Sequence, residues 1–288
     1  MEEILVKGIT LPHAYHKAIL SLATNGVELG DNDYGGKMKE VSLTFQVMEP
    51  LRDPMISKLF VGGPQELQQY VMEICDGILD FMIYEPVEWK LEQSAKDTGW
   101  KYTYHSRMRN FPAFYYDDFG GTFSCGWKKD KGIDQVQFVI TDLKRSRYSR
   151  RAVINLRDNT YDTKNYDAAC VNHIQFFIRD DKLHCKVLIR SNDAVKASFM
   201  NAFALIKLQE KIAKELEVPV GTYSHKANSY HCYEKDFLTL ERYQDAIMNK
   251  HHKELVYNYE GDWKELMMDS VPNILKNIET MKINKESD

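Results

Sequence analysis

The amino-acid sequence predicts an α+β fold in which a mixed β-sheet packs against helices. Residues 173–178 and 183–189 are apolar runs separated by the polar turn RDDK, which indicates a β-hairpin. Residues 194–215 follow directly and carry apolar side chains at helical spacing, which indicates a helix. A chain of 288 residues is long enough to bury a full hydrophobic core under these elements.

The other expected elements follow along the chain. We expect a helix over residues 11–26, a strand over 41–47, a helix over 65–81 and a strand over 151–156. Residues 98–135 are rich in glycine, aromatic residues and aspartate, and we expect long loops around short strands there. The C-terminal part alternates helical patterns with polar breaks and finishes in the charged tail NKESD.

The predicted hairpin places a cysteine beside an arginine. If the turn centres on Asp180 and Asp181, the numbers of paired residues sum to 361, so residue 170 lies opposite residue 191. We therefore expect Cys170 close to Arg190 and Ser191. A cysteine beside a strand is either a small buried apolar side chain or a nucleophile, and a nearby cation favours the thiolate that a nucleophile needs.

Composition narrows the class of protein. The net charge of -4 argues against a protein dedicated to nucleic acid. The N-terminus lacks the apolar core of a secretory signal, and no run of about 18 apolar residues indicates a membrane span. Five cysteines without a CxxC pair favour neither a disulfide framework nor a zinc ribbon, so we expect a cytoplasmic protein. His251 and His252 have no carboxylate at ligand spacing, so we expect no metal site.

Three further features each have a structural and a functional interpretation. Residues 144–151, KRSRYSRR, form either a solvated or nucleic-acid-binding loop or a phosphate clamp, since guanidinium groups bind phosphate oxygens in pairs. Asn201 lies on the apolar stripe of its helix and either makes a structural hydrogen bond or reads the edge of a base. His231 and Tyr233 share one face of a strand and are either surface aromatics or ligands for hydroxyl groups.

Together these residues resemble the thymidylate synthase superfamily. The resemblance rests on Ser149-Arg150-Arg151, Cys170, Gln175, Arg190-Ser191-Asn192-Asp193, Asn201 and His231-Cys232-Tyr233, at spacings that also match. The segments RSNDAVKASFMNAFALIKLQEKIAKEL and NSYHCY are most similar to the archaeal-type branch. The resemblance implies the family's fold as one catalytic domain over residues 1–288, with 280–288 as a flexible tail. It also implies a homodimer in which the two sheets pack face to face.

The resemblance implies a reaction and its catalytic residues. The family attaches a one-carbon unit from 5,10-methylenetetrahydrofolate, or a related reduced pterin, to C5 of dUMP. Cys170 would be the nucleophile that adds to C6 of the pyrimidine, and a soft thiolate suits that addition. Tyr104 resembles the family's active-site tyrosine, and Asp193 would lie at the pterin and the base. Glu73 best fits the family's proton-relaying glutamate, with Glu85 and Glu88 as rivals.

The resemblance also assigns the binding residues. Arg190 and Ser191 would hold the nucleotide phosphate, and Arg150 and Arg151 would reach it from the partner subunit. Gln175 would help to position the base, Asn201 would bond O4 and N3 of uracil, and His231 and Tyr233 would bond the sugar 3′-hydroxyl. The arginine of the family's N-terminal phosphate loop is absent from NDYGGKMK, where Tyr34 and Lys37 or Lys39 stand instead. A lysine there would hold phosphate only as a point charge.

The resemblance implies a methylene group on C5 of the base as an intermediate, and the final product depends on what then reacts with that group. The family's synthases deliver hydride and form a methyl group, whereas its phage hydroxymethylases admit water. Three features favour water: Asn172 and Gln175 follow Cys170 as in the phage enzymes, Ala169 replaces the usual proline, and a charged tail replaces the apolar one that closes the synthases. Our first expectation is a deoxyuridylate hydroxymethylase, in the host cytoplasm if a phage encodes it.

Three alternatives stay open. The first is a thymidylate synthase, which shares every earlier step of the reaction. The second is a dCMP hydroxymethylase, which Asn201 disfavours because such enzymes tend to carry Asp at that position. The third is a silent relative that binds nucleotide or RNA through residues 144–151.

Overall fold

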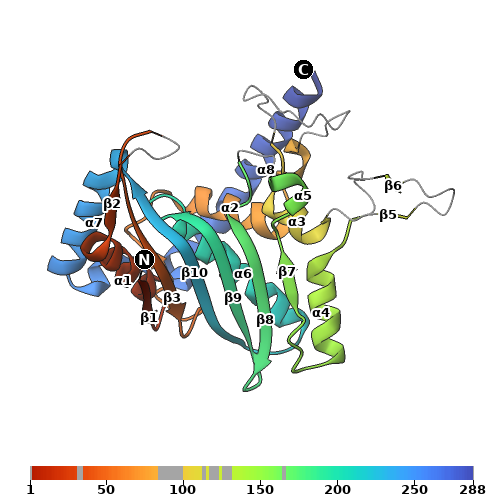
Figure 1. Cartoon of the computed structure of the whole chain (residues 1–288), viewed down its shortest axis with the longest axis horizontal. Helices are drawn as coiled ribbons and strands as arrows, with labels where there is room; N and C mark the ends of the chain where they lie inside the picture. Colours follow the sequence, from red (N-terminus) through yellow and green to blue (C-terminus); the bar gives the residue numbers. More distant parts are fainter. Residues whose placement is uncertain are drawn as a thin grey trace.

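A seven-stranded mixed sheet forms the centre of the molecule (Figure 1). The computed structural model describes residues 2–30, 35–83, 100–111, 115–116, 123–124, 132–163 and 167–287. The strands of the sheet are β1 Glu3–Gly8, β2 Val27–Leu29, β3 Met38–Val47, β7 Val153–Asn155, β8 Val171–Arg179, β9 Lys182–Asp193 and β10 Val220–Tyr233. They are ordered β1-β3-β10-β9-β8-β7, and β2 pairs with the start of β3.

The sheet combines parallel and antiparallel pairs, as predicted. Strand β1 runs parallel to β3 and β9 runs parallel to β10, whereas the other neighbours are antiparallel. Because β9 and β10 are parallel, their C-terminal ends meet at one edge of the sheet. Strand β8 is antiparallel to β9 and begins at that same edge, so the residues just before β8 lie beside the last residues of β9.

The β8–β9 hairpin has the predicted turn and nearly the predicted register. Asp180 and Asp181 have φ of 48° and 57°, as the two-residue type I′ turn requires. Paired residues from Ile178 and Leu183 back to His173 and Leu188 follow the predicted register. A bulge then shifts the register by one, so Cys170 lies beside residue 190 rather than residue 191.

The helices are α1 Leu11–Asn25, α2 Pro64–Asp76, α3 Tyr104–Arg109, α4 Gln135–Arg145, α5 Asn159–Asp162, α6 Ser198–Glu215, α7 Phe237–Asn249 and α8 Lys264–Ser287. Two-residue strands pair as β4 Ile56–Ser57 with β11 Val256–Tyr257 and as β5 Tyr115–Tyr116 with β6 Phe123–Ser124. Helix α6 lies behind β8, β9 and β10 in Figure 1 and is buried on most of its surface, because it packs between the sheet and helices α1 and α2. None of the described helices is both long and apolar enough to cross a membrane.

The opposite face of the sheet is more open. Paired side chains of neighbouring strands point to the same face, and on this face they are partly or fully exposed. They include Thr44, Gln46, His173, Gln175, Lys186 and Lys226. The two faces therefore differ, with an apolar one under the helices and a polar one open to a partner or to solvent.

The expected elements at 11–26, 41–47, 65–81, 151–156 and 194–215 are all present, with shifted ends. The expectation of loops throughout 98–135 was wrong at α3. Thr103 caps this helix: its hydroxyl accepts a hydrogen bond from the Ser106 N–H, while the Ser106 hydroxyl accepts one from the Thr103 N–H. Residues 280–287, expected as a tail, continue helix α8.

Candidate active site

A cavity of about 490 Å³ opens at the sheet edge where β9 and β10 end and β8 begins. This volume lies within the range of about 300–1,000 Å³ that is usual for small-molecule sites. The cavity is lined by Met38, Tyr70, Tyr104, Cys170, Arg190, Ser191, Asn192, Asp193, Ala197, Asn201, Ser229, His231 and Tyr233. The structure thus brings together most of the predicted site residues, from α3, the residues just before β8, strands β9 and β10, and helix α6.

Cys170 sits in the cavity wall just before β8. Its carbonyl oxygen accepts a hydrogen bond from the Arg190 backbone N–H at 2.8 Å, which places the two residues side by side as predicted. Burial raises the pKa of the Cys170 thiol, while the Arg190 charge acts in the opposite direction. Arg190 therefore favours the thiolate as expected, but burial outweighs it in the free protein.

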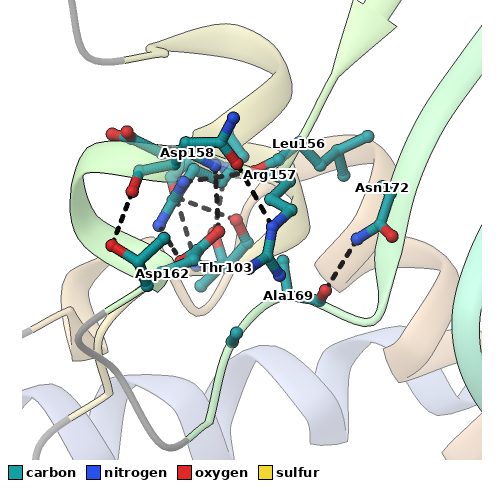
Figure 2. Close-up of polar contacts among 12 residues, drawn as sticks. Thr103, Leu156, Arg157, Asp158, Asp162, Ala169 and Asn172 are labelled. Atoms are coloured by element: carbon teal, nitrogen blue, oxygen red, sulfur yellow. Dashed lines mark hydrogen bonds and ion pairs between the residues drawn. The ribbon is translucent and has the colours of Figure 1, made fainter.

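Arg190 also supports the loop that carries the cysteine. Its guanidinium Nε donates to the Ala169 carbonyl oxygen at 3.2 Å, and Nη2 donates to the Ala168 carbonyl oxygen at 2.6 Å. Asn172 Nδ2 donates to the same Ala169 oxygen at 2.9 Å (Figure 2). The backbone before Cys170 is thereby fixed from both sides, which is what a nucleophile with a defined direction needs.

A buried ion pair lies behind this loop. Arg107 on α3 donates from Nη2 to Asp162 Oδ1 at 3.0 Å and from Nη1 to the Leu156 carbonyl oxygen at 3.2 Å. The Asp158 backbone N–H donates to Asp162 Oδ2 at 2.9 Å (Figure 2). The pair ties α3, which carries Tyr104, to the segment that leads toward Cys170.

Four of the remaining cavity residues stand at the ends of two parallel strands. Ser229 pairs with Ser191 and His231 pairs with Asp193 in the β9–β10 ladder. Asp193 Oδ1 accepts hydrogen bonds from the backbone N–H groups of Val195 and Lys196, both at 2.9 Å, which turns the chain into α6. The ladder thus presents serine, aspartate and histidine side chains at one edge.

The tautomer of His231 follows from its neighbours. The Ser229 hydroxyl donates to Glu40 Oε2, and His231 Nδ1 lies 3.3 Å from both Oγ and the carbonyl oxygen of Ser229. Because the hydroxyl proton is used and a carbonyl only accepts, Nδ1 of His231 carries the proton. Burial lowers the pKa of His231, so the ring is neutral and Nε2 keeps a lone pair for a ligand hydroxyl.

The other end of the cavity is formed by helices. Asn201 stands in the first turn of α6, and its Oδ1 accepts a hydrogen bond from the Tyr70 hydroxyl on α2. Tyr104 lies in the same wall, and its pKa is raised by burial and then by the nearby Cys170. Two phenol groups and a carboxamide therefore surround the space beside the thiol.

Glu73 lies outside the cavity wall, one turn after Tyr70 on α2. Its Oε1 accepts a hydrogen bond from Gln69 Nε2 at 2.9 Å, and burial raises the pKa of its carboxyl group. The rival residues Glu85 and Glu88 lie outside the described residues, as does Tyr34. Among the described helical residues of α2, it is Tyr70 rather than Glu73 that lines the cavity.

Gln175 does not lie in the cavity wall. Its side chain is on the open face of the sheet, where Nε2 donates to the Arg150 carbonyl oxygen at 2.9 Å. Its strand neighbours Ile174 and Phe176 are buried on the apolar face, and because side chains alternate along a strand, Gln175 points to the open face. Gln175 therefore does not line this chain's own cavity, and its contact with the base stays a prediction.

Arg150 and Arg151 also lie away from the wall. Arg151 Nη2 donates to Asp142 Oδ1 at 3.1 Å, and this aspartate also binds Arg145 and the Ser149 hydroxyl. Lys37 is exposed beside the lining residue Met38, and its backbone exchanges two hydrogen bonds with Glu234. These three basic residues do not reach this chain's own cavity.

Sequence reasoning missed five lining residues, which are Met38, Tyr70, Asn192, Ala197 and Ser229. A signal existed for two of them. Ser229 precedes His231 by two positions on a strand, and Tyr70 precedes Glu73 by three positions on a helix, so each shares a face with a predicted residue. Among the described residues, no three histidine, cysteine or acidic side chains gather to hold a metal ion.

The chain is similar to several known proteins. The family model described as thymidylate synthase matches residues 64–271. A protein of Methanocaldococcus jannaschii named "Putative thymidylate synthase" is 25% identical over 246 residues, covering 83% of this chain and 96% of its own. A Mycoplasma genitalium thymidylate synthase is 26% identical over 153 residues, covering 51% and 53%. Among solved structures, thermostable thymidylate synthase A of Bacillus subtilis matches with a TM-score of 0.55 and 18% identity over 82% of this chain and 84% of its own, which shows the shared fold.

Proposed function

The chain belongs to the thymidylate synthase family and is a one-carbon transferase, and from this premise we propose that it acts on C5 of dUMP with 5,10-methylenetetrahydrofolate as donor. The observation that carries the proposal is the single cavity wall that holds Cys170, Arg190, Asn201 and His231. The reaction needs four groups: a thiol, a guanidinium that binds phosphate, an amide that reads the base, and an imidazole nitrogen that accepts a hydrogen bond from a sugar hydroxyl.

Cys170 supplies the nucleophile. Its sulfur forms a bond to C6 of the pyrimidine, and the electron pair of the C5–C6 double bond moves toward C5 and O4. C5 then forms a bond to the one-carbon unit as the bond between that carbon and one of its two donor nitrogens breaks. Loss of the C5 proton and of the carrier leaves a methylene group on C5, with the ring still attached to Cys170.

The other cavity residues orient the nucleotide. Asn201 stands beside the thiol and meets the edge of the base, while His231 Nε2 and Tyr233 meet the sugar hydroxyl. Arg190 and Ser191 hold the phosphate at the sheet edge. Because Arg190 already braces the loop before Cys170, phosphate binding and thiol position depend on the same side chain.

The cavity also fits a reduced pterin. The donor supplies the activated carbon, and the chain supplies the walls that align it with C5. Asp193 uses one carboxylate oxygen for the turn into α6 and still lines the cavity, where a carboxylate suits the N–H groups of a pterin ring. Glu73, with a raised pKa and a position one turn behind Tyr70, is a proton reservoir near the base end.

A homodimer completes the site in this proposal. Arg150 and Arg151 lie outside their own chain's cavity, and the Arg150 carbonyl is bonded to Gln175 on the open face of the sheet. Two chains that pack through this face bring these arginines toward each other's cavities. Each site then receives phosphate ligands from both subunits.

For the final step we keep the hydroxymethyl product as first candidate. Ala169 and Asn172 surround Cys170 in the pattern of the phage hydroxymethylases, and the hydroxyls of Tyr70 and Tyr104 offer partners for a water near C5. Thymidylate is the second candidate, favoured by the names of the curated relatives. In the first case water adds to the methylene group as Cys170 leaves, and in the second hydride from the folate does so.

Mass analysis of the product from dUMP and methylenetetrahydrofolate tests the proposal, with Cys170→Ala as control. A gain of CH₂O that depends on Cys170 establishes the hydroxymethylase. A gain of CH₂, with dihydrofolate formed, establishes the synthase and overturns the first candidate. Absence of any Cys170-dependent product overturns one-carbon transfer to dUMP altogether.

A further inference from the structure

The Tyr70 hydroxyl is bonded directly to the side-chain amide of Asn201, to which the proposed function gives the reading of the base. This hydroxyl donates a hydrogen bond to Asn201 Oδ1, across the contact between α2 and α6. Its pKa is raised by burial and then by the nearby Tyr104, Glu73 and Cys170, so the hydroxyl keeps its proton. A phenol that stays protonated is a lasting donor, and it needs an acceptor in this buried place.

This contact decides how the amide is turned. A carboxamide has an oxygen that accepts and a nitrogen that donates, and rotation about its last bond exchanges them. With Oδ1 held by Tyr70, the Nδ2 hydrogens remain for a ligand in the cavity. The second lone pair of Oδ1 remains as well, so the amide offers a donor beside an acceptor.

The two pyrimidines differ at the edge that such a group meets. Uracil carries an acceptor at C4 and an N3–H donor, which match the fixed donor and acceptor of Asn201. Cytosine carries an amino donor at C4 and an unprotonated N3, which oppose both. An amide free to rotate would match either base, whereas a fixed amide matches uracil alone.

We propose that Tyr70 is a specificity-determining residue: its hydroxyl fixes the Asn201 amide so that the site selects a pyrimidine with a carbonyl rather than an amino group at C4. The inference rests on the proposed nucleotide function. Tyr70 acts through Asn201 and is thus a positioning residue for the base. Replacing it by Phe keeps the ring that packs between the helices and removes the donor alone.

Calorimetric Kd values for dUMP and dCMP test the inference. We compare the wild type with Tyr70→Phe, Asn201→Ala and the double variant, and use Tyr257→Phe, an exposed tyrosine on β11 outside the cavity, as the matched control. We expect the preference for dUMP over dCMP to fall about tenfold or more in Tyr70→Phe, the equivalent of one mismatched hydrogen bond. In the double variant the preference should fall no further than in Asn201→Ala.

The outcomes separate this inference from the function on which it rests. If Tyr70→Phe weakens both nucleotides equally and keeps the wild-type preference, Tyr70 is structural and the inference is overturned while the function stands. If the wild type binds neither nucleotide, the proposed function itself fails. Selective ¹⁵N-asparagine labelling gives a second readout, with the Asn201 signals identified by their loss in Asn201→Ala. The Asn201 Nδ2 signals of the wild type should shift with dUMP and not with dCMP, and an equal response to both would also overturn the inference.

Discussion

Removing Arg107 should destabilise the protein strongly. The side chain is 5% exposed and its partner Asp162 is 0% exposed, so Arg107→Ala leaves a buried carboxylate without its cation. It also leaves the Leu156 carbonyl oxygen without a hydrogen bond from Arg107. Breaking a buried ion pair by removing one partner costs about 3–5 kcal/mol. That is a large part of the total stability of about 5–15 kcal/mol of a folded protein.

Urea denaturation and thermal unfolding measure this loss. A cost of that size corresponds to a fall in the melting temperature of about 6–20 °C for a chain of this length. The same helix supplies a matched control, because Arg109 pairs with Asp134 while both side chains are 37–40% exposed. Arg109→Ala should cost at most about 1 kcal/mol.

The loss of stability in Arg107→Ala, compared with that in Arg109→Ala, tests whether burial governs the cost. If Arg107→Ala and Arg109→Ala destabilise equally, burial does not govern the cost and the reasoning is refuted. A second measurement bears on the site: because the ion pair ties α3 to the segment before Cys170, Arg107→Ala should also lower kcat in the fraction that stays folded. Arg109→Ala should leave kcat unchanged.

Three further outcomes are expected. Burial lowers the pKa of both His16 and His225 to about 3, so below about pH 6.5 the unfolded chain binds protons that the folded chain does not bind. The free energy of unfolding should therefore be full above about pH 6.5 and fall below it by about 1.4 kcal/mol per pH unit for each histidine. Urea denaturation of His225→Gln at several pH values should show a smaller slope of this free energy against pH. Alkylation of Cys170 by iodoacetamide, followed by peptide mass mapping, should have a midpoint above the ordinary thiol pKa, and Arg190→Gln should move it higher; a midpoint near neutral pH would contradict the burial argument. If the dimer shares its sites, Cys170→Ala and Arg150→Ala should each be inactive alone. After subunit exchange their equal mixture should recover about a quarter of wild-type activity, because half of the dimers are mixed and each mixed dimer has one intact site. No recovery would count against sites shared between subunits.

Much of the sheet was predictable because its signals are local. The β8–β9 hairpin has two apolar runs and a two-residue aspartate turn, so its register followed from counting until the bulge before His173. A bulge leaves no clear trace in the pattern of side chains, since one extra residue changes the face of everything beyond it. Gln175 is a different case: its place at the base was expected from the resemblance alone, and in the structure its amide bonds the Arg150 carbonyl oxygen on the open face of the sheet.

Helix α3 and the base end of the cavity were harder to foresee. Helix α3 is six residues long, too short for periodicity to show, and depends on the reciprocal cap between Thr103 and Ser106. Tyr70 approaches Asn201 only because α2 packs against α6, at a separation of 131 residues in the sequence. A contact set by tertiary packing has no local signature, whereas Cys170 and Arg190 were found because a single hairpin joins them.

The two ends of the cavity differ in how they can respond to a ligand. Ser191, Asp193, Ser229 and His231 stand on neighbouring strands joined by a ladder of backbone hydrogen bonds, so none of them can shift without its neighbours. Tyr70 and Asn201 stand on two helices that meet through side chains, and packed helices can slide by small amounts. The sugar and phosphate end is therefore a fixed reference, and any tightening around a bound base is expected as a sliding of α2 along α6.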